Sequence, residues 1–278
     1  MSPFDNQVVV VTGGGAGIGA AYARMFAGQG AKVVVNDLDG DAAQATAKEV
    51  GGWAVVGDAS TEAGIEQLIS TARDLAGPIE VYCANAGVAR GGMVDVAEKA
   101  WDVSWQVNVM AHVRAAKLLM PQWVSQGHGR FVSTVSAAGL LSIPGAAPYA
   151  VTKHAALAYA EWLFITYADA GLRVQAVCPQ GVRTRMFDDS GAAGKALMAD
   201  SVIEADDVAA ALLAAIDADQ FLVLPHPEVG PMYAGRAADP DRWLTGMRRQ
   251  NRSLPKDWTP EWKVGTEQAA QSFGPPAT

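Results

Sequence analysis

The sequence is poor in cysteine, in positive charge and in long apolar runs, and each shortage argues against a class of protein. The 278 residues include only two cysteines. Each stands in a short apolar run without a histidine nearby, so we expect Cys83 and Cys178 to be inert buried thiols and not a disulfide or a metal site. The formal net charge is -8 and no long basic run occurs, so a nucleic-acid partner is not expected.

The N-terminal residues and the hydropathy pattern also limit where the protein functions. Residues 1–7 lack the basic region of a signal peptide, and the valine run that follows is too short for its apolar core. No apolar stretch approaches the ~18 residues that a membrane-spanning helix needs. We therefore expect a cytoplasmic protein without a membrane partner, and half of its residues are apolar, which suffices for a full core.

Short apolar runs alternate with alanine-rich segments of helical period along most of the sequence, and this pattern predicts a doubly wound α/β fold. Strands that alternate with helices form a parallel sheet covered on both faces, because their crossovers are right-handed. No change of composition interrupts the alternation, so one Rossmann-type domain is expected over residues 1–254. The seven predicted strands are Val8–Val11, Lys32–Asn36, Trp53–Val56, Ile79–Cys83, Gly129–Thr134, Arg173–Cys178 and Gln220–Leu224.

The composition changes after Leu224, where proline and tryptophan become frequent. Asp239 followed by Pro240 is typical of a helix start and predicts a short helix through Arg249. Residues 255–278 are interpreted as a tail without regular structure, which is either partly ordered or lies across the fold or a neighbouring subunit.

Tyr149 and Lys153 stand four residues apart at the predicted start of a helix, and Ser136 lies thirteen residues upstream. One helical turn places the phenol and the ammonium on one face, where they can meet. A phenol has a pKa of about 10 and acts as a base near neutrality only if this falls by roughly 3 units, or about 4 kcal/mol. One ammonium about 5 Å away contributes about 3 kcal/mol at an effective dielectric near 20. We therefore expect Lys153 nearly to suffice, and if the chain binds a dinucleotide, a positively charged nicotinamide would supply the remainder.

A glycine-rich turn from Thr12 to Gly19 follows the first predicted strand and opens a helical run from Ala20 to Ala27. Its glycines let the backbone approach a pyrophosphate, which binds at the positive N-terminus of the helix. The second strand ends in Asp37, eighteen residues after Gly19, where a carboxylate accepts hydrogen bonds from ribose hydroxyls. The same carboxylate repels a ribose 2′-phosphate, so the sequence predicts NAD and not NADP as the cofactor.

Together the turn Thr12-Gly13-x-x-x-Gly17-Ile18-Gly19, Ser136, Tyr149 and Lys153 make the chain similar to the short-chain dehydrogenase/reductase family over nearly its whole length. The resemblance implies that Tyr149 is the catalytic acid/base, that Lys153 also binds the nicotinamide ribose, and that Ser136 hydrogen-bonds the substrate oxygen. It implies a catalytic role for Asn108 as well, whose backbone carbonyl would hold a water connecting the lysine to solvent. The cofactor-binding residues that it implies are Gly13, Gly17, Ile18, Gly19, Asp37, Asp58, Ala59, Asn85, Ala86, Gly87, Tyr149, Lys153, Val182 and Thr184.

The sequence departs from the family pattern at two places. Ala84-Asn85 replaces a double asparagine, and Pro179-Gln180 replaces Pro-Gly. The side chain of Gln180 either narrows the nicotinamide end or reaches the substrate, or it belongs to a surface loop.

The residues expected to face the substrate are largely apolar, which favours a hydrophobic secondary alcohol. They are Val88, Met93, Ser136, Leu140, Leu141, Ile143, Tyr149, Gln180, Met186 and Phe187. Three arginines close to them in sequence either bind a carboxylate or are ordinary exposed loop residues, namely Arg90, Arg183 and Arg185. Residues 187–200, rich in glycine, alanine and aspartate, are expected to form a mobile lid.

The expected reaction is hydride transfer between an alcohol and NAD, with Tyr149 moving the proton. The alternatives are a carbonyl reductase that uses NADPH, an epimerase or enoyl reductase on the same scaffold, and a non-catalytic NAD-binding regulatory subunit. No metal is expected, because the four histidines are scattered. In relatives two long helices form the main subunit contact, so the apolar helices predicted over Trp101–Val124 and Tyr149–Asp169 imply a homotetramer, with a dimer as the second choice.

Overall fold

Seven strands pair in the order β3-β2-β1-β4-β5-β6-β7 in the computed structural model of the protein, which describes residues 2–255. Every neighbouring pair is parallel, and all seven predicted strands are present. The last is shorter than expected, because only two of its residues pair with β6. The strands are β1 Val8–Thr12, β2 Lys32–Asp37, β3 Trp53–Val56, β4 Ile79–Ala84, β5 Gly129–Thr134, β6 Leu172–Val177 and β7 Leu222–Val223.

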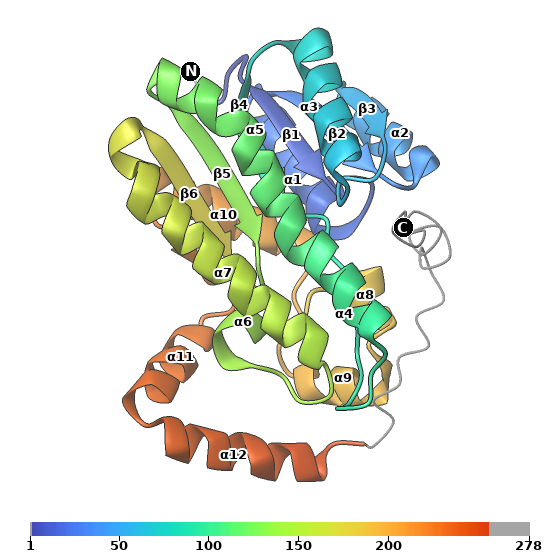
Figure 1. Cartoon of the computed structure of the whole chain (residues 1–278), viewed down its shortest axis with the longest axis vertical. Helices are drawn as coiled ribbons and strands as arrows, with labels where there is room; N and C mark the ends of the chain where they lie inside the picture. Colours follow the sequence, from blue (N-terminus) through green and yellow to red (C-terminus); the bar gives the residue numbers. More distant parts are fainter. Residues whose placement is uncertain (1, 256–278) are drawn as a thin grey trace, which may run out of the picture.

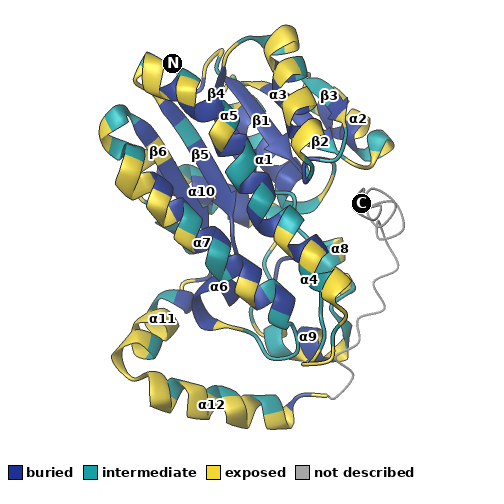
Figure 2. Cartoon of the chain, in the orientation of Figure 1, coloured by how far each residue is buried: buried dark blue, intermediate teal, exposed yellow. Residues whose placement is uncertain are grey.

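Helices cover both faces of this sheet, as the alternation of strands and helices predicts (Figure 1). In β1, Val9 and Val11 pack on one face and Val8 and Val10 on the other, because successive strand side chains point in opposite directions. Figure 2 accordingly shows the strands almost wholly buried between helices whose outer surfaces are exposed. One face packs on α1 (Gly17–Gly28), α2 (Gly40–Glu49) and α10 (Ala205–Asp217), and the other on α3 (Glu62–Ala76), α5 (Ala111–Gln126) and α7 (Ala147–Tyr167).

The strand order reverses between β1 and β4, and the carboxyl ends of parallel strands beside such a reversal form a crevice for ligands. Several short elements surround that end of the sheet or connect the longer ones. They are α4 (Glu98–Trp105), the π-helical segment η1 (Gln106–Met110), α6 (Ala138–Leu141), the 3₁₀ turn η2 (Ala168–Ala170), α8 (Arg185–Asp188) and α9 (Gly191–Met198).

Two further helices, α11 (Val229–Ala238) and α12 (Pro240–Ser253), lie apart from the sheet layers at one end of the molecule (Figure 1). The predicted start of α12 is confirmed, since the side chain of Asp239 accepts a hydrogen bond from the backbone of Arg242 at 2.9 Å. The helix continues to Ser253, past the predicted end at Arg249, and α11 is an addition to the sequence prediction. Apart from Pro255, the predicted tail lies outside the described residues.

Both cysteines are free and buried, as expected. Burial raises the pKa of the Cys178 thiol to about 12 and raises that of Cys83 as well, so both remain protonated at neutral pH. Among residues 2–255, none of the helices combines the length and the apolar character that a membrane crossing requires.

Candidate active site

A cavity of about 1220 Å³ runs along the carboxyl edge of the sheet. Ligand sites usually enclose about 300–1,000 Å³, so this one is large enough for more than a single small molecule. It brings together residues that lie far apart in the sequence. The predicted site residues that line it are Gly13, Gly17, Ile18, Asp37, Asp58, Ala59, Asn85, Ala86, Gly87, Val88, Ser136, Leu141, Ile143, Tyr149, Lys153, Gln180, Val182, Thr184, Met186 and Phe187.

The glycine-rich turn is held against β4 by the hydroxyl of Thr12. This hydroxyl donates to the carbonyl of Cys83 at 3.1 Å and accepts from the backbone N–H groups of Asn85 and Ala86 at 3.0 and 3.1 Å. A Cβ at Gly19 would lie 2.1 Å from a backbone oxygen of the turn, so only glycine fits there. Because α1 begins without a side-chain cap, the N–H groups of its first turn are left to bind an anion such as a pyrophosphate.

Two aspartates mark the far end of the cavity, beyond β2 and β3. The carboxylate of Asp37 accepts from the backbone of Gly15 at 2.9 Å and of Asp39 at 3.0 Å. Asp58 uses Oδ1 to accept two bonds from Ser60, whereas its Oδ2 is buried and has no partner among the described residues. An unpartnered carboxylate oxygen in this position fits a donor such as the amino group of adenine.

The charge around Asp37 fits a ribose with a free 2′-hydroxyl. Among residues 2–255, no lysine or arginine forms an ion pair with Asp37 or Asp58. A 2′-phosphate would therefore meet a carboxylate without a compensating cation.

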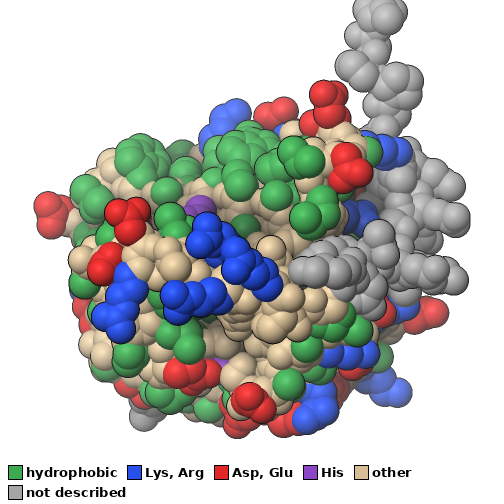
Figure 3. Space-filling view, turned by 90° about the horizontal axis from the view of Figure 1, so that it is seen from below, with side chains coloured by type: hydrophobic (Ala, Val, Ile, Leu, Met, Phe, Trp, Pro, Cys, Tyr) green, Lys and Arg blue, Asp and Glu red, His purple; other side chains and the backbone are tan. Residues whose placement is uncertain are grey.

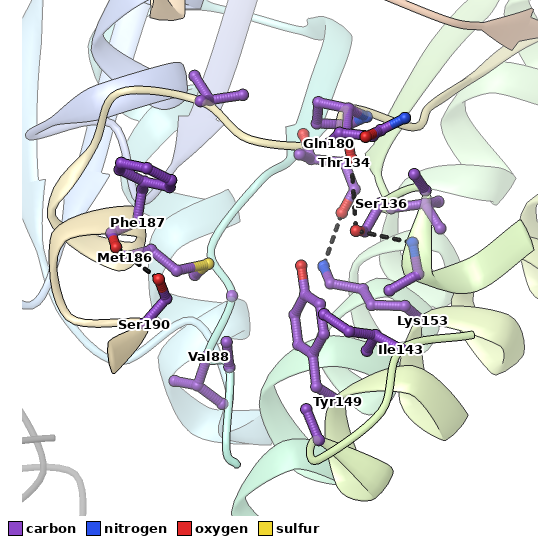
Figure 4. Close-up of a pocket in the computed structure, with 18 of the residues that line it drawn as sticks. Val88, Thr134, Ser136, Ile143, Tyr149, Lys153, Gln180, Met186, Phe187 and Ser190 are labelled. Atoms are coloured by element: carbon purple, nitrogen blue, oxygen red, sulfur yellow. Dashed lines mark hydrogen bonds between the residues drawn. The ribbon is translucent and has the colours of Figure 1, made fainter. Parts of the chain in front are cut away.

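Ser136, Tyr149 and Lys153 lie together at the other end of the cavity (Figure 4). Ser136 comes shortly after the end of β5. Its hydroxyl accepts a hydrogen bond from the backbone N–H of Ala138 at 3.1 Å and donates one to the carbonyl of Pro179 at 3.4 Å. Because α7 starts at Ala147, Tyr149 and Lys153 occupy the same face of its first turns. The distance from the ammonium of Lys153 to the centre of the Tyr149 ring is 5.8 Å.

The ammonium of Lys153 does not by itself make Tyr149 acidic. Burial raises the pKa of the Tyr149 phenol, and the nearby hydroxyl of Ser136 lowers it only in part. Nζ of Lys153 instead donates to the carbonyl of Thr134 at 2.8 Å. The prediction that the lysine nearly suffices is therefore wrong for the protein alone, because the fold desolvates the phenol and directs the ammonium towards a backbone oxygen.

Lys153 is almost completely buried, and this burial lowers its pKa from 10.5 to about 8. A group with a pKa of about 8 is still mainly protonated at neutral pH. Lys153 therefore remains a cation beside the phenol, although burying its charge costs desolvation free energy.

Asn108 lies in the middle of η1, where the predicted long helix is broken into α4, a π-helical turn and α5. Its buried side-chain amide accepts from the backbone N–H of Val88 and donates to the carbonyl of Val88, both at 2.9 Å, and also donates to Thr152 at 3.0 Å. A Cβ at Gly87 would lie 3.4 Å from both Asn108 and Lys153. The side chain thus fixes the loop that borders the lysine, whereas Asn108 itself does not line the cavity, and its predicted carbonyl–water role stays a prediction.

Thr152 is a part of this arrangement that the sequence reasoning missed. Its hydroxyl donates to the carbonyl of Pro148 at 2.7 Å and accepts from Asn108. The sequence did contain a signal for this role. Thr152 stands one helical turn after Pro148, which is typical of a hydroxyl that bonds back to the helix backbone.

Gln180 is anchored in the cavity wall. Its Oε1 accepts from the hydroxyl of Ser201 at 3.1 Å, and its backbone N–H donates to the ring of His226 at 3.1 Å. The segment that these bonds fasten carries α8 and α9, and a β-bridge between Val182 and Ile203 closes its base. Part of the predicted lid is thus helical and lines the cavity with Phe187, Leu197 and Met198 among others, while its mobility stays a prediction.

Some predicted substrate contacts do not reach the cavity. Leu140 is 1% exposed and packs in the core, because the single turn of α6 directs it towards the sheet, so its prediction is wrong. Met93 is exposed at the surface, and Arg183 forms an ion pair with Glu204 at 2.6 Å outside the cavity lining.

The sequence prediction also missed the wall that α11 and α12 contribute. On α12 the lining residues recur at helical spacing, which indicates that one face of this helix borders the cavity. The lining residues from these two helices and the turn between them are Met232, Gly235, Ala238, Asp239, Arg242, Trp243, Gly246, Met247 and Gln250.

Comparison with known proteins agrees with this geometry. The sequence pattern of the family described as short chain dehydrogenase matches residues 7–194. The chain is 34% identical to 1-deoxy-11-beta-hydroxypentalenate dehydrogenase of Streptomyces exfoliatus, over 81% of this chain and 85% of the relative.

Two solved structures share the fold as well as part of the sequence. A short chain dehydrogenase/reductase from Burkholderia phymatum in complex with NAD has a TM-score of 0.79 at 29% identity, covering 87% of this chain and 96% of that one. A 3-ketoacyl-(acyl-carrier-protein) reductase from Brucella melitensis complexed with NADH has a TM-score of 0.71 at 27% identity, covering 80% and 96%. The chain therefore belongs to the short chain dehydrogenase family and is an oxidoreductase of that family.

Proposed function

We propose that the protein oxidises a hydrophobic secondary alcohol to its ketone with NAD, using Tyr149 as the acid/base. The observation that carries the proposal is the cavity itself, in which Ser136, Tyr149 and Lys153 converge at one end and Asp37 and the glycine-rich turn lie at the other.

The residues at the catalytic end divide the proton chemistry between them. Tyr149 takes the hydroxyl proton of the alcohol, and Ser136 hydrogen-bonds the same oxygen while its charge changes. Lys153 remains a cation close to the phenol and favours its ionised form. Bound NAD would supply the hydride acceptor and a further positive charge that favours the phenolate. Burial raises the pKa of the phenol in the protein alone, and that further charge acts in the opposite direction.

The choice of NAD rests on the acidic far end of the cavity. Asp37 accepts hydrogen bonds there, and the residue that follows it is Leu38, which carries no charge for a 2′-phosphate. The two related structures described above hold NAD and NADH. Because cellular NAD is mostly oxidised, we infer that the physiological direction is oxidation of the alcohol.

The hydrophobic substrate is inferred from the opposing wall of the cavity. Figure 4 shows Val88, Met186 and Phe187 facing Tyr149 and Ile143 across the open space. The relative from Streptomyces exfoliatus is named as the dehydrogenase of a hydroxy compound, which is consistent with alcohol oxidation.

Formation of NADH from a panel of alicyclic and aromatic secondary alcohols tests the proposal. We expect turnover by the natural chain and a loss of at least about 100-fold in kcat for Tyr149→Phe, the size of a lost general base. Undiminished activity in that variant would refute the assigned chemistry. A tenfold preference for ketone reduction with NADPH would reverse both the cofactor and the direction.

We also infer that the protein is a homotetramer whose copies meet through α5 and α7. The outer surface of α7 exposes large apolar side chains, including Trp162 at 50% and Ile165 at 80%, and such a contiguous apolar surface is typical of an interface. Light scattering coupled to gel filtration measures the mass, and Ile165→Glu should reduce the number of copies. A natural chain of monomeric mass would contradict the inference.

A further inference from the structure

Arg90 lies on the loop between β4 and α4 and lines the cavity. Two residues later, the backbone of Gly92 donates to the carbonyl of Gly145 at 2.8 Å and pairs with Ala146 as a β-bridge. Ala146 directly precedes α7, the helix that carries Tyr149. The loop with Arg90 is therefore fastened to the segment that positions the catalytic phenol.

The guanidinium of Arg90 has no counter-charge within the described residues 2–255. Among residues 2–255 nothing forms a hydrogen bond or an ion pair with it, although its side chain is partly buried. Its neighbours differ, since Arg183 binds Glu204 at 2.6 Å and Arg185 lies 4.0 Å from Asp189. Partial burial of a cation without a partner is unfavourable, and burial lowers the pKa of Arg90 accordingly. A bound anion would remove this cost.

The helix that borders the same cavity is basic, although the chain as a whole carries a net charge of -8. Between Pro240 and Ser253, α12 carries four arginines and one aspartate, and Arg242 lines the cavity. Figure 3 looks onto this end of the molecule and shows lysine and arginine side chains gathered there. Positive charge around the opening of a cavity attracts anionic ligands and raises their rate of association.

We propose that Arg90 binds a carboxylate on the substrate, so that the substrate is a hydrophobic hydroxy acid. This rests on the proposed function, because it concerns the alcohol that Tyr149 deprotonates. A guanidinium binds a carboxylate through two parallel hydrogen bonds, and the apolar walls of the cavity bind the hydrocarbon body between the acid group and the reacting hydroxyl. The assigned site is separate from the adenosine end, which Asp37 and Asp58 mark.

A pair of rigid apolar probes tests the inference by binding and needs no turnover. Adamantane-1-carboxylate and the neutral adamantane-1-carboxamide differ in charge but hardly in shape. Calorimetry with the full chain and saturating NADH should show the carboxylate binding at least about tenfold more tightly, the value of one charge-assisted hydrogen-bonded pair. In Arg90→Met the ratio should fall to near one. Arg183→Met is the matched control and should keep the ratio of the natural chain.

Each other outcome is informative. Failure of the natural chain to bind the carboxylate, a ratio near one, or an unchanged ratio in Arg90→Met overturns the inference. A loss of NADH affinity of about tenfold in Arg90→Met would assign the guanidinium to the cofactor and also overturn it. If that variant does not fold, Arg90→Lys keeps the charge without the paired geometry and should give an intermediate ratio. The proposed function is refuted by a different result, namely that no alcohol gives NADH. The ratio of carboxylate to carboxamide affinity can still be measured in that case.

Discussion

Replacing Lys153 with methionine should change how the stability of the protein depends on pH. Lys153 is 3% exposed, and burial lowers its pKa from 10.5 to about 8. In the unfolded chain the lysine regains a value near 10.4. Between these two values the unfolded chain binds more protons than the folded protein, so the free energy of unfolding increases with pH. Methionine has a similar length and no proton to bind, so Lys153→Met lacks this contribution.

The size of the effect follows from the shift of the pKa. One pKa unit corresponds to about 1.36 kcal/mol, and the interval from pH 8 to pH 10 covers two units of the shift. The natural protein should therefore gain about 2.5 kcal/mol of unfolding free energy over Lys153→Met between pH 7 and pH 10. The part of the hydrogen bond to Thr134 that depends on the charge of Lys153 is already contained in its pKa, and contributions that do not depend on ionisation cancel between the two pH values.

Urea denaturation followed by tryptophan fluorescence measures the difference at a series of pH values. Protein concentration is held constant, because subunit association would otherwise contribute to the apparent stability. Other groups that titrate in this range and lie far from Lys153 are common to both proteins and cancel in the difference. A difference that stays constant from pH 7 to pH 10, or that changes in the opposite direction, would show that Lys153 is not a desolvated cation.

Three other changes should have separate effects. Asp37→Ala should raise KM for NAD about tenfold and lower KM for NADP, since it removes an acceptor for the ribose hydroxyls and a charge that repels a 2′-phosphate. Steady-state kinetics with both cofactors measures this, and an unchanged preference for NAD would contradict it. Gly19→Ala should lower the unfolding free energy by roughly 1–3 kcal/mol, because its Cβ would overlap a backbone oxygen, whereas the control Gly28→Ala meets no atom within 4 Å and should be neutral in thermal denaturation. Thr152→Val should leave one N–H donor of Asn108 unpaired and lower the free energy of unfolding by about 1–3 kcal/mol. It should also lower kcat more than the affinity for NAD, and equal losses of the two would argue for a structural role alone.

The strands of the fold could be predicted from the sequence because each is encoded locally. Val8–Val11 and Gly129–Thr134 are short apolar or β-branched runs bounded by glycine and polar residues, and the structure contains both as strands. The start of α12 was equally local, since Asp239 and Pro240 form the cap themselves. By contrast, the π-helical turn at Gln106–Met110 has no local signature, because it depends on Asn108 bonding across to Val88 and Thr152.

Most of the site residues that the resemblance to the short-chain dehydrogenase/reductase family implies line the cavity, while their roles stay predictions. Leu140 could not be placed correctly, since one turn of helix decides whether a side chain faces the cavity or the core. Gln180 could not be resolved from its position in the chain either. Its partners, Ser201 and His226, come from segments more than twenty residues away.

The sequence by itself determined the parallel α/β plan, the glycine-rich turn before α1, and the placement of Tyr149 and Lys153 on one helical face, because periodicity and spacing act over a few residues. Only the tertiary structure decided which groups those side chains meet. It raised the pKa of Tyr149 by burial, and it placed the ammonium of Lys153 where it donates a hydrogen bond to the carbonyl of Thr134. Among residues 2–255 it also left Arg90 without a counter-charge, in a cavity that α12 helps to line. Desolvation and charge pairing depend on segments that only folding brings together.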